Sequence, residues 1–525
     1  MSITFRNKLF FLIVLFSIFT QIPNIIQLNF LGSFLAKSLS FYPILFGVVY
    51  FFYDRYKQKD NFNLSKSDNI FLKYISIYFF VLIISFIHGL MIYPYYDDIL
   101  SGPINQIDKL FSVQRILVSL NIDISEELLL RIWMFCRLIK GFILETFWYF
   151  AVPYIIYDWY KHNVSEGFSI LIKGVIGGVV LICVYNVFDI MYLSGLNIGA
   201  SILTTLNPII HAIESNGTWW PPIVWNEKQL RSLFAEPSYY GIYASFAMPL
   251  IWYSFMVTTN KLKNVWLSIL IFLFTFGLFL TNARTGNALF FVELILLVLF
   301  SIWRYKKCNL KKVATIFFLS IIAFFISIGV LNIMPGGIDK SSEITQKNIN
   351  GLVVNYFQDN IGSLSNVDKR SNRARFAMLE SNIAIGLDYP ILGVGKSLRD
   401  AYVPAYLSER SRADGEVQYW IKNQTEKGIL KSGFPELGEY SSRFATTGIV
   451  GIIVFFIPII YLIGSLFCRI RLAKYQYEQE RCIFFFISFS GIVISGIGDV
   501  LSITCCYWIL LGLGYAIITS PYERK

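Results

Sequence analysis

The chain has 525 residues, of which 55% are hydrophobic and only 15% are charged. Soluble domains usually carry about 25% charged residues, so this composition excludes an ordinary soluble protein. The net charge of +11 does not indicate a nucleic acid partner, because excess Lys and Arg is what fixes the cytoplasmic loops of a polytopic membrane protein.

Apolar runs of about 18 to 22 residues recur along the chain and are long enough to cross a hydrocarbon core about 30 Å thick. The first follows Arg6 and Lys8 and lacks a small-residue cleavage site, which predicts a retained span and not a signal peptide. We therefore expect an all-α polytopic fold with about twelve spans. The predicted spans are residues 9–28, 38–53, 71–93, 141–158, 169–193, 238–257, 264–281, 287–304, 313–333, 445–467, 483–498 and 500–519.

Most of the loops assigned to the inner side are rich in Lys and Arg, as the positive-inside rule requires. This predicts an even number of spans with both termini on the cytoplasmic side of the membrane. Residues 1–333 then form spans one to nine, and residues 444–525 form the last three spans and a short tail. The basic loops are residues 54–70, 258–263, 305–312 and 468–482.

Three segments are predicted to lie outside the membrane. Residues 94–140 end in an amphipathic stretch with Arg131, Arg137 and Lys140, which predicts an interfacial helix leading into the fourth span. Residues 194–237 are rich in Trp and Pro, and residues 334–443 should form a large, partly helical extracytoplasmic loop.

The seven cysteines have no paired metal-ligand spacing, and the large loop contains none of them. No H-E-x-x-H or D-x-D pattern is present. The sequence therefore gives no reason to expect a metal or another cofactor.

Arg284 interrupts two apolar runs in the stretch "LFLTNARTGNALFF". A snorkelling turn residue is one interpretation. The other is an anion site at the outer end of the spans, because arginine binds phosphate oxygens in a bidentate manner and stays charged. Hydrogen-bonding side chains surround it, namely Thr281, Asn282, Thr285 and Asn287.

Two further clusters have both a structural and a functional interpretation. In "RSLFAEPSYYG", Glu236 precedes Pro237 and is either a helix cap or a general base for a hydroxyl group. Around the start of a predicted amphipathic helix, Lys369, Arg370, Arg373 and Arg375 form either a solvated basic surface or a phosphate-binding cluster.

Four stretches occur in a familiar order: "LFAEPSYYGIYASFAMPL", "LTNARTGNALFFVELILL", "RFAMLESNIAIGLDYPILGVG" and "FATTGIVGIIVFFIPIIYL". Together with the large outer loop, they resemble the bacterial O-antigen polymerase and ligase family over residues 220–467. Ten residues separate Arg375 from Gly386, a spacing associated with the outer loops of these polymerases. The resemblance implies a helical fold of the GT-C type.

The family joins glycans outside the cytoplasmic membrane, using donors on undecaprenyl pyrophosphate. Lipid-linked donor and acceptor glycans and the bilayer are the implied partners, with a flippase and a chain-length regulator as further candidates. Arginines would stabilise the leaving pyrophosphate. The implied catalytic residues are Glu236, Arg284 and Arg375, and the implied substrate-binding residues are Arg231, Lys369, Arg370, Arg373 and Arg443.

The chain departs from the family's ligases at one position. Those ligases typically carry a histidine about eleven residues before the "TG" that opens the following span, where this chain has Leu437. The missing histidine favours a polymerase of repeat units over a ligase. A polysaccharide transporter is the alternative of another class, although the related halves expected of a transporter are not visible.

Overall fold

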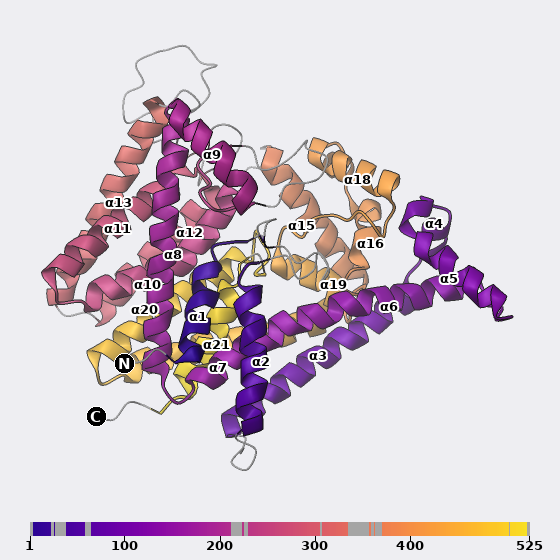
Figure 1. Ribbon diagram of the computed structural model, residues 1–525, viewed down its shortest axis with the longest axis horizontal. Coiled ribbons are helices and arrows are strands. Elements are labelled where there is room, and N and C mark those ends of the chain that lie inside the picture. The colour runs from indigo at the N-terminus through magenta and orange to yellow at the C-terminus, as the bar shows by residue number, and fades with distance from the viewer. Residues whose placement is uncertain are drawn as a thin grey trace.

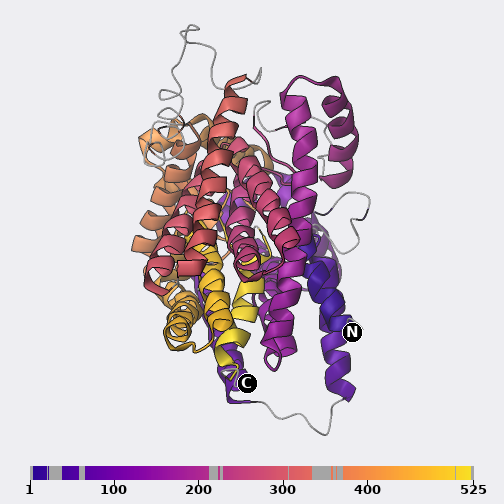
Figure 2. The ribbon, with the colours of Figure 1, turned by 90° about the vertical axis from the view of Figure 1, so that its left-hand side faces the viewer.

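The computed structural model describes residues 4–20, 22, 26, 38–57, 65–211, 223–224, 229–304, 307–333, 356, 358, 362, 370–502 and 504–521. Within these ranges the chain is helical and contains no strand. The predicted all-α polytopic fold is therefore confirmed. Most of the long helices run in roughly the same direction (Figure 2).

Seven of the described helices are long and apolar enough to cross a membrane. Each coincides with a predicted span. They are α3 (Lys66–Ile92), α8 (Val164–Leu193), α10 (Pro237–Val257), α11 (Lys261–Leu280), α12 (Arg284–Arg304), α13 (Lys307–Ile333) and α19 (Glu439–Leu472).

Each of the other five predicted spans overlaps a helix that is shorter or carries more charge, and residues 21, 23–25 and 27–28 of the first span lie outside the described residues. Helix α20 is 20 residues long, yet its first two turns read "QYEQER". The number of twelve spans therefore stays a prediction. These five helices are α1 (Phe5–Phe16), α2 (Phe41–Lys57), α7 (Val152–Tyr160), α20 (Gln476–Ser495) and α21 (Cys506–Thr519).

The first predicted interfacial segment is helical, and the second begins with a helix. Helices α4 (Tyr96–Leu100), η5 (Ile104–Gln106) and α5 (Asp108–Ser119) precede α6 (Glu126–Thr146), which continues through the π-helical turn η6 (Phe147–Ala151) into α7. On α6, Arg131 pairs with Glu127 one turn away. The side chains of Arg137 and Lys140 lie outside the described residues. Helix α9 (Asn197–Ile210) follows α8.

The described part of the large loop forms a small helical unit, whose apolar core it shares with helices α4 to α6. It contains α15 (Arg370–Asp388), α16 (Arg399–Tyr406), α17 (Glu409–Arg412) and α18 (Gly415–Lys427), which gather in the upper half of Figure 1. Buried side chains such as Met378, Leu398, Tyr402 and Val417 fill this core. The described part of the loop, residues 370–443, is therefore a packed structure.

The helical unit is joined to the membrane bundle by hydrogen bonds at a break in α19. Gly448 has φ 62° and ψ −165°, which interrupts the helix, and glycine adopts this backbone region without a steric penalty. The segment "PILGVG" fills the interruption: the amide of Val394 donates to the carbonyl of Ala445 (2.9 Å), and the amide of Ile449 donates to that of Pro390 (2.8 Å). The hydrogen bonds lost at the break are thereby replaced.

Candidate active site

A cavity of about 890 Å³ lies where α10, α12, α15 and the turn after α20 meet. Its lining includes Glu236, Arg284 and Arg375, the three residues predicted to be catalytic. They come from positions up to 139 residues apart in the sequence. Further polar residues in the lining are Gln229, Ser238, Asn282, Thr285, Asn372 and Glu416.

A pair of glycines brings the first two of these residues together. Helices α10 and α12 touch at Gly241 and Gly286, where a Cβ atom on Gly241 would lie 2.4 Å from the Cα atom of Gly286. Glu236 is the N-cap of α10, and Arg284 is the first residue of α12. The close backbone approach therefore sets two helix N-termini side by side, and their dipoles favour negative charge in the cavity.

The local turn fixes where Arg284 begins its helix. The hydroxyl of Thr281 donates to the carbonyl of Leu278 (2.6 Å) and accepts from the amide of Ala283 (3.1 Å). Asn282 has φ 49°, in the left-handed region that asparagine tolerates. The half-buried Arg284 then donates from Nη1 to Oδ1 of Asn372 on α15 (2.9 Å), which ties the loop unit to the bundle at the cavity.

Arg375 owes its position to Gly386, eleven residues further along the chain. Eleven positions are close to three turns of a helix, so Arg375 and Gly386 share one face of α15. Gly386 packs so closely on α19 that a Cβ atom there would lie 2.3 Å from Cδ1 of Phe444. The Nη1 atom of Arg375 donates to the carbonyl of Gly498 and lies 3.5 Å from Oδ2 of Asp499. The arginine–glycine spacing therefore has a packing explanation.

Glu236 lies half-buried at the cavity wall, and the hydroxyl of Ser238 donates to its Oε2 atom (3.3 Å). Burial raises the pKa of Glu236, the negative charge of Asp499 raises it further, and Arg375 opposes both effects. A carboxylate with a raised pKa is a stronger base than an ordinary one. The residue can therefore cap α10 and also accept a proton from a hydroxyl group.

Sequence reasoning missed two acidic residues beside these three. Asp499 is buried, and its pKa is raised by burial, with Arg375 lowering it. The signal was available, because Asp499 interrupts two apolar runs in "SGIGDVLS" just as Arg284 does earlier in the chain. Glu416, near the start of α18, also lines the cavity, and nothing in its sequence surroundings points to it.

Arg231 lies away from the residues that line this cavity. Its side chain is 1% exposed, and Oδ2 of Asp189 on α8 accepts the backbone amides of Arg231 (3.2 Å) and Ser232 (2.7 Å). Burial lowers the pKa of Arg231 to about 10, against the raising effect of Asp189. In this structure the arginine anchors the loop before α10 to the end of α8.

Of the remaining predicted binding residues, Arg443 and Arg373 are not among the described residues that line the cavity. Arg443 is buried in α19, where it pairs with Glu439, donates to the hydroxyl of Tyr78 and stacks 4.0 Å from the ring centre of Phe455. Arg373 is exposed and lies 3.6 Å from the carboxylate of Asp414. Arg370 begins α15, but its side chain lies outside the described residues, as does the whole of Lys369.

Leu437, which stands near the place of the ligase histidine, lines the cavity. The difference noted in the sequence therefore falls in the wall that Glu236 and Arg284 share. Within the ranges that the structure describes, no group of three or more His, Cys, Asp or Glu side chains is arranged to hold a metal ion. Metal independence itself stays a prediction.

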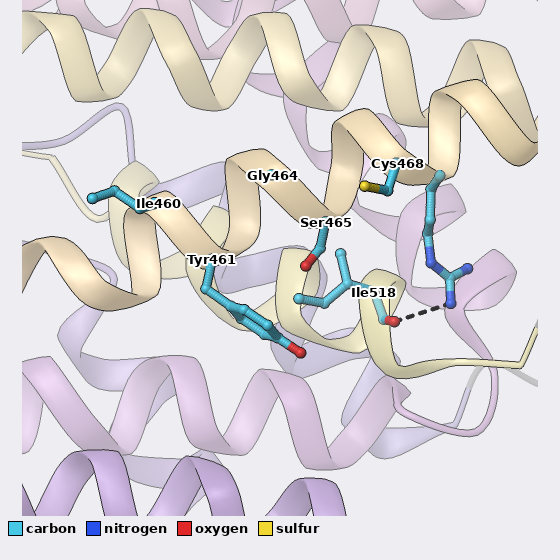
Figure 3. A pocket seen from close by; sticks show the side chains of 7 residues that line it. Ile460, Tyr461, Gly464, Ser465, Cys468 and Ile518 are labelled. Carbon is cyan, nitrogen blue, oxygen red and sulfur yellow. Dashed lines mark hydrogen bonds between the residues drawn. The ribbon is translucent and has the colours of Figure 1, made fainter.

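A second cavity of about 460 Å³ lies between α19 and α21. Figure 3 shows Tyr461, Ser465 and Ile518 at its wall. The arginine beside it, Arg469, donates to the carbonyls of Ile518 (3.0 Å) and Ser520, which caps the end of α21. No carboxylate lines it, so it offers less chemistry than the first cavity.

The fold and the cavity define a polytopic membrane protein with a helical unit packed over a polar cavity at the ends of its helices. Residues 267–435 match the family model described as O-antigen ligase. The match supports membership of the O-antigen ligase and polymerase family, confirms the resemblance seen in the sequence, and implies a glycan-processing enzyme. No curated protein matches the chain.

Proposed function

We propose that this protein is a polymerase that joins lipid-linked oligosaccharide repeat units into a surface polysaccharide. The supporting observation is that Glu236, Arg284 and Arg375 line one cavity at the N-termini of α10 and α12. The donor and acceptor would be glycans on undecaprenyl pyrophosphate. The reaction would take place at the outer face of the bacterial cytoplasmic membrane, with both protein termini in the cytoplasm.

Each residue has a role that fits its surroundings. The donor pyrophosphate binds beside Arg284 and Arg375, whose charges and planar N–H groups suit phosphate oxygens. Glu236 takes the proton from an acceptor hydroxyl as its oxygen forms a bond to the anomeric carbon of the donor. The bond from that carbon to the phosphate oxygen breaks, and the lipid pyrophosphate leaves with the electron pair. The arginines stabilise the negative charge that develops on it.

The residue at position 437 supports the choice of a polymerase over a ligase. A leucine in the cavity wall cannot accept a proton, so the proposed base is Glu236, whose pKa is raised. A polymerase retains its product on the lipid carrier and lengthens it. The description of the matching family model favours the second candidate, a ligase that moves a finished chain to another acceptor.

The proposal is tested with purified protein and a synthetic undecaprenyl-pyrophosphate-linked repeat unit. We expect a ladder of longer glycans that remain on the carrier. Glu236→Gln keeps the size of the side chain but removes the base, and should lower the rate at least a hundredfold, the range of general-base contributions. Glu426→Gln on exposed α18 is the matched control. Transfer to a different acceptor without any ladder would contradict the polymerase proposal.

A further inference from the structure

We infer that Asp499 is a positioning residue that holds the Arg375 guanidinium at the wall of the cavity that Glu236 also lines. The inference rests on the proposed function of that cavity. Asp499 is absent from the matched family region, which ends at residue 435, and lies in the turn between α20 and α21.

The turn that carries Asp499 is fixed on both sides. The amide of Asp499 donates to the carbonyl of Ser495 (3.1 Å), and its carbonyl accepts from the amide of Glu439 at the start of α19 (3.2 Å). The carboxylate of Glu439 in turn accepts from the amide of Leu501 (2.9 Å). The backbone of the turn cannot move without breaking these hydrogen bonds, so the Asp499 carboxylate has a defined position.

Arg375 reaches this turn from α15. Its Nη1 atom contacts the carbonyl of Gly498 and the carboxylate of Asp499 (3.5 Å). The Asp499 side chain is 5% exposed, whereas that of Arg375 is 31% exposed. A guanidinium has five N–H donors, so contacts made through one nitrogen leave the others available to an anion in the cavity. A buried carboxylate is costly without a paired cation, which makes this pairing the stable arrangement of both side chains.

The same carboxylate acts on Glu236. Burial raises the pKa of Glu236 most, and the charge of Asp499 raises it further. Arg375 and the hydrogen bond from Ser238 lower this pKa, and Glu416 raises it slightly. Arg284 also lines the cavity, and Tyr239 is one turn along α10. Removing the charge of Asp499 removes a repulsion that favours the protonated form of Glu236. The Glu236 pKa should then fall. The decrease in reaction rate at acidic pH, where Glu236 becomes protonated, should therefore occur at lower pH.

The experiment compares Asp499→Asn with the wild-type protein in the purified elongation assay across a pH series. We expect kcat to fall at least tenfold, since a loosely held catalytic group loses its alignment, with the acidic limb at lower pH. Asp499→Glu, which keeps the charge, should recover part of the rate. Asp400→Asn is the control, because Asp400 also forms an ion pair with an arginine, Arg399, but does not line the cavity.

A double-mutant comparison separates positioning from loss of folding. If Asp499 acts through Arg375, then Arg375→Gln combined with Asp499→Asn should be no slower than Arg375→Gln alone, because the pair is removed as a unit. Additive losses, or a wild-type rate and pH profile in Asp499→Asn, would overturn the inference. A wild-type protein that elongates no lipid-linked repeat would instead overturn the proposed function.

Discussion

Replacing Gly386 with alanine tests whether helix packing places Arg375 in the active cavity. The new Cβ atom would lie 2.3 Å from Cδ1 of Phe444, whereas carbon atoms in contact lie about 3.5–4.0 Å apart. Helix α15 must therefore move by about 1 Å, or the phenyl ring must turn. Overpacking of this kind costs about 1–3 kcal/mol of stability, and a 1 Å displacement of a catalytic group can lower the rate about a hundredfold.

The assay is elongation of the lipid-linked repeat by detergent-purified Gly386→Ala, with gel filtration to verify folding. Gly464→Ala on α19 is the matched control, because a Cβ atom there meets nothing within 4 Å. Combining Gly386→Ala with Phe444→Ala opens the space that the methyl group needs and should restore much of the rate. Full activity in Gly386→Ala, or no recovery in the double variant, would refute the explanation of the arginine–glycine spacing.

Three further predictions concern the cavity directly. Arg284→Lys keeps the charge but loses the planar guanidinium group, so the elongation rate should fall while expression stays normal. Arg284→Ala should be slower still. If Arg284→Ala makes polymer of normal length, Arg284 is a turn residue only. The base must be deprotonated to act, so the wild-type rate should fall as the pH drops through the raised pKa of Glu236. Glu236→Gln should no longer show this fall in rate at acidic pH. If the fall is unchanged in Glu236→Gln, another group causes it. Elongation should continue in excess EDTA, and a loss of activity that magnesium or manganese restores would contradict metal-independent transfer.

Hydropathy was sufficient to predict the seven long apolar helices of this protein, because each of them coincides with an apolar run long enough for a span. It was not sufficient to count the spans, since α20 begins with charged residues and α21 has only 14 residues. The break in α19 was also beyond sequence reasoning. "TTG" and "PILGVG" lie about fifty residues apart, and only the folded chain shows that Gly448 and Val394 belong to one hydrogen-bonded crossing.

For the site, charges placed between apolar runs were the useful signal. Arg284 was identified in this way, and Asp499 would have been if the turn between the last two runs had been examined for the same feature. The basic cluster was less informative, because neighbouring residues on a helix point in different directions: Arg375 faces the cavity, whereas Arg373 is exposed beside Asp414. Arg231 shows the remaining difficulty, since a buried arginine with a structural role and a ligand-binding arginine look alike in a sequence.

The central claim, polymerisation of lipid-linked repeats, is tested most directly by the lipid-linked glycans that accumulate in a deletion strain. Deleting a polymerase and deleting a ligase should leave different glycans on the lipid carrier. A polymerase builds the chain on the carrier, whereas a ligase removes the finished chain from it. We expect single repeat units on undecaprenyl pyrophosphate when this protein is absent, and normal chains when the gene is restored. Long chains accumulating on the carrier in the deletion strain would contradict the account and identify a ligase.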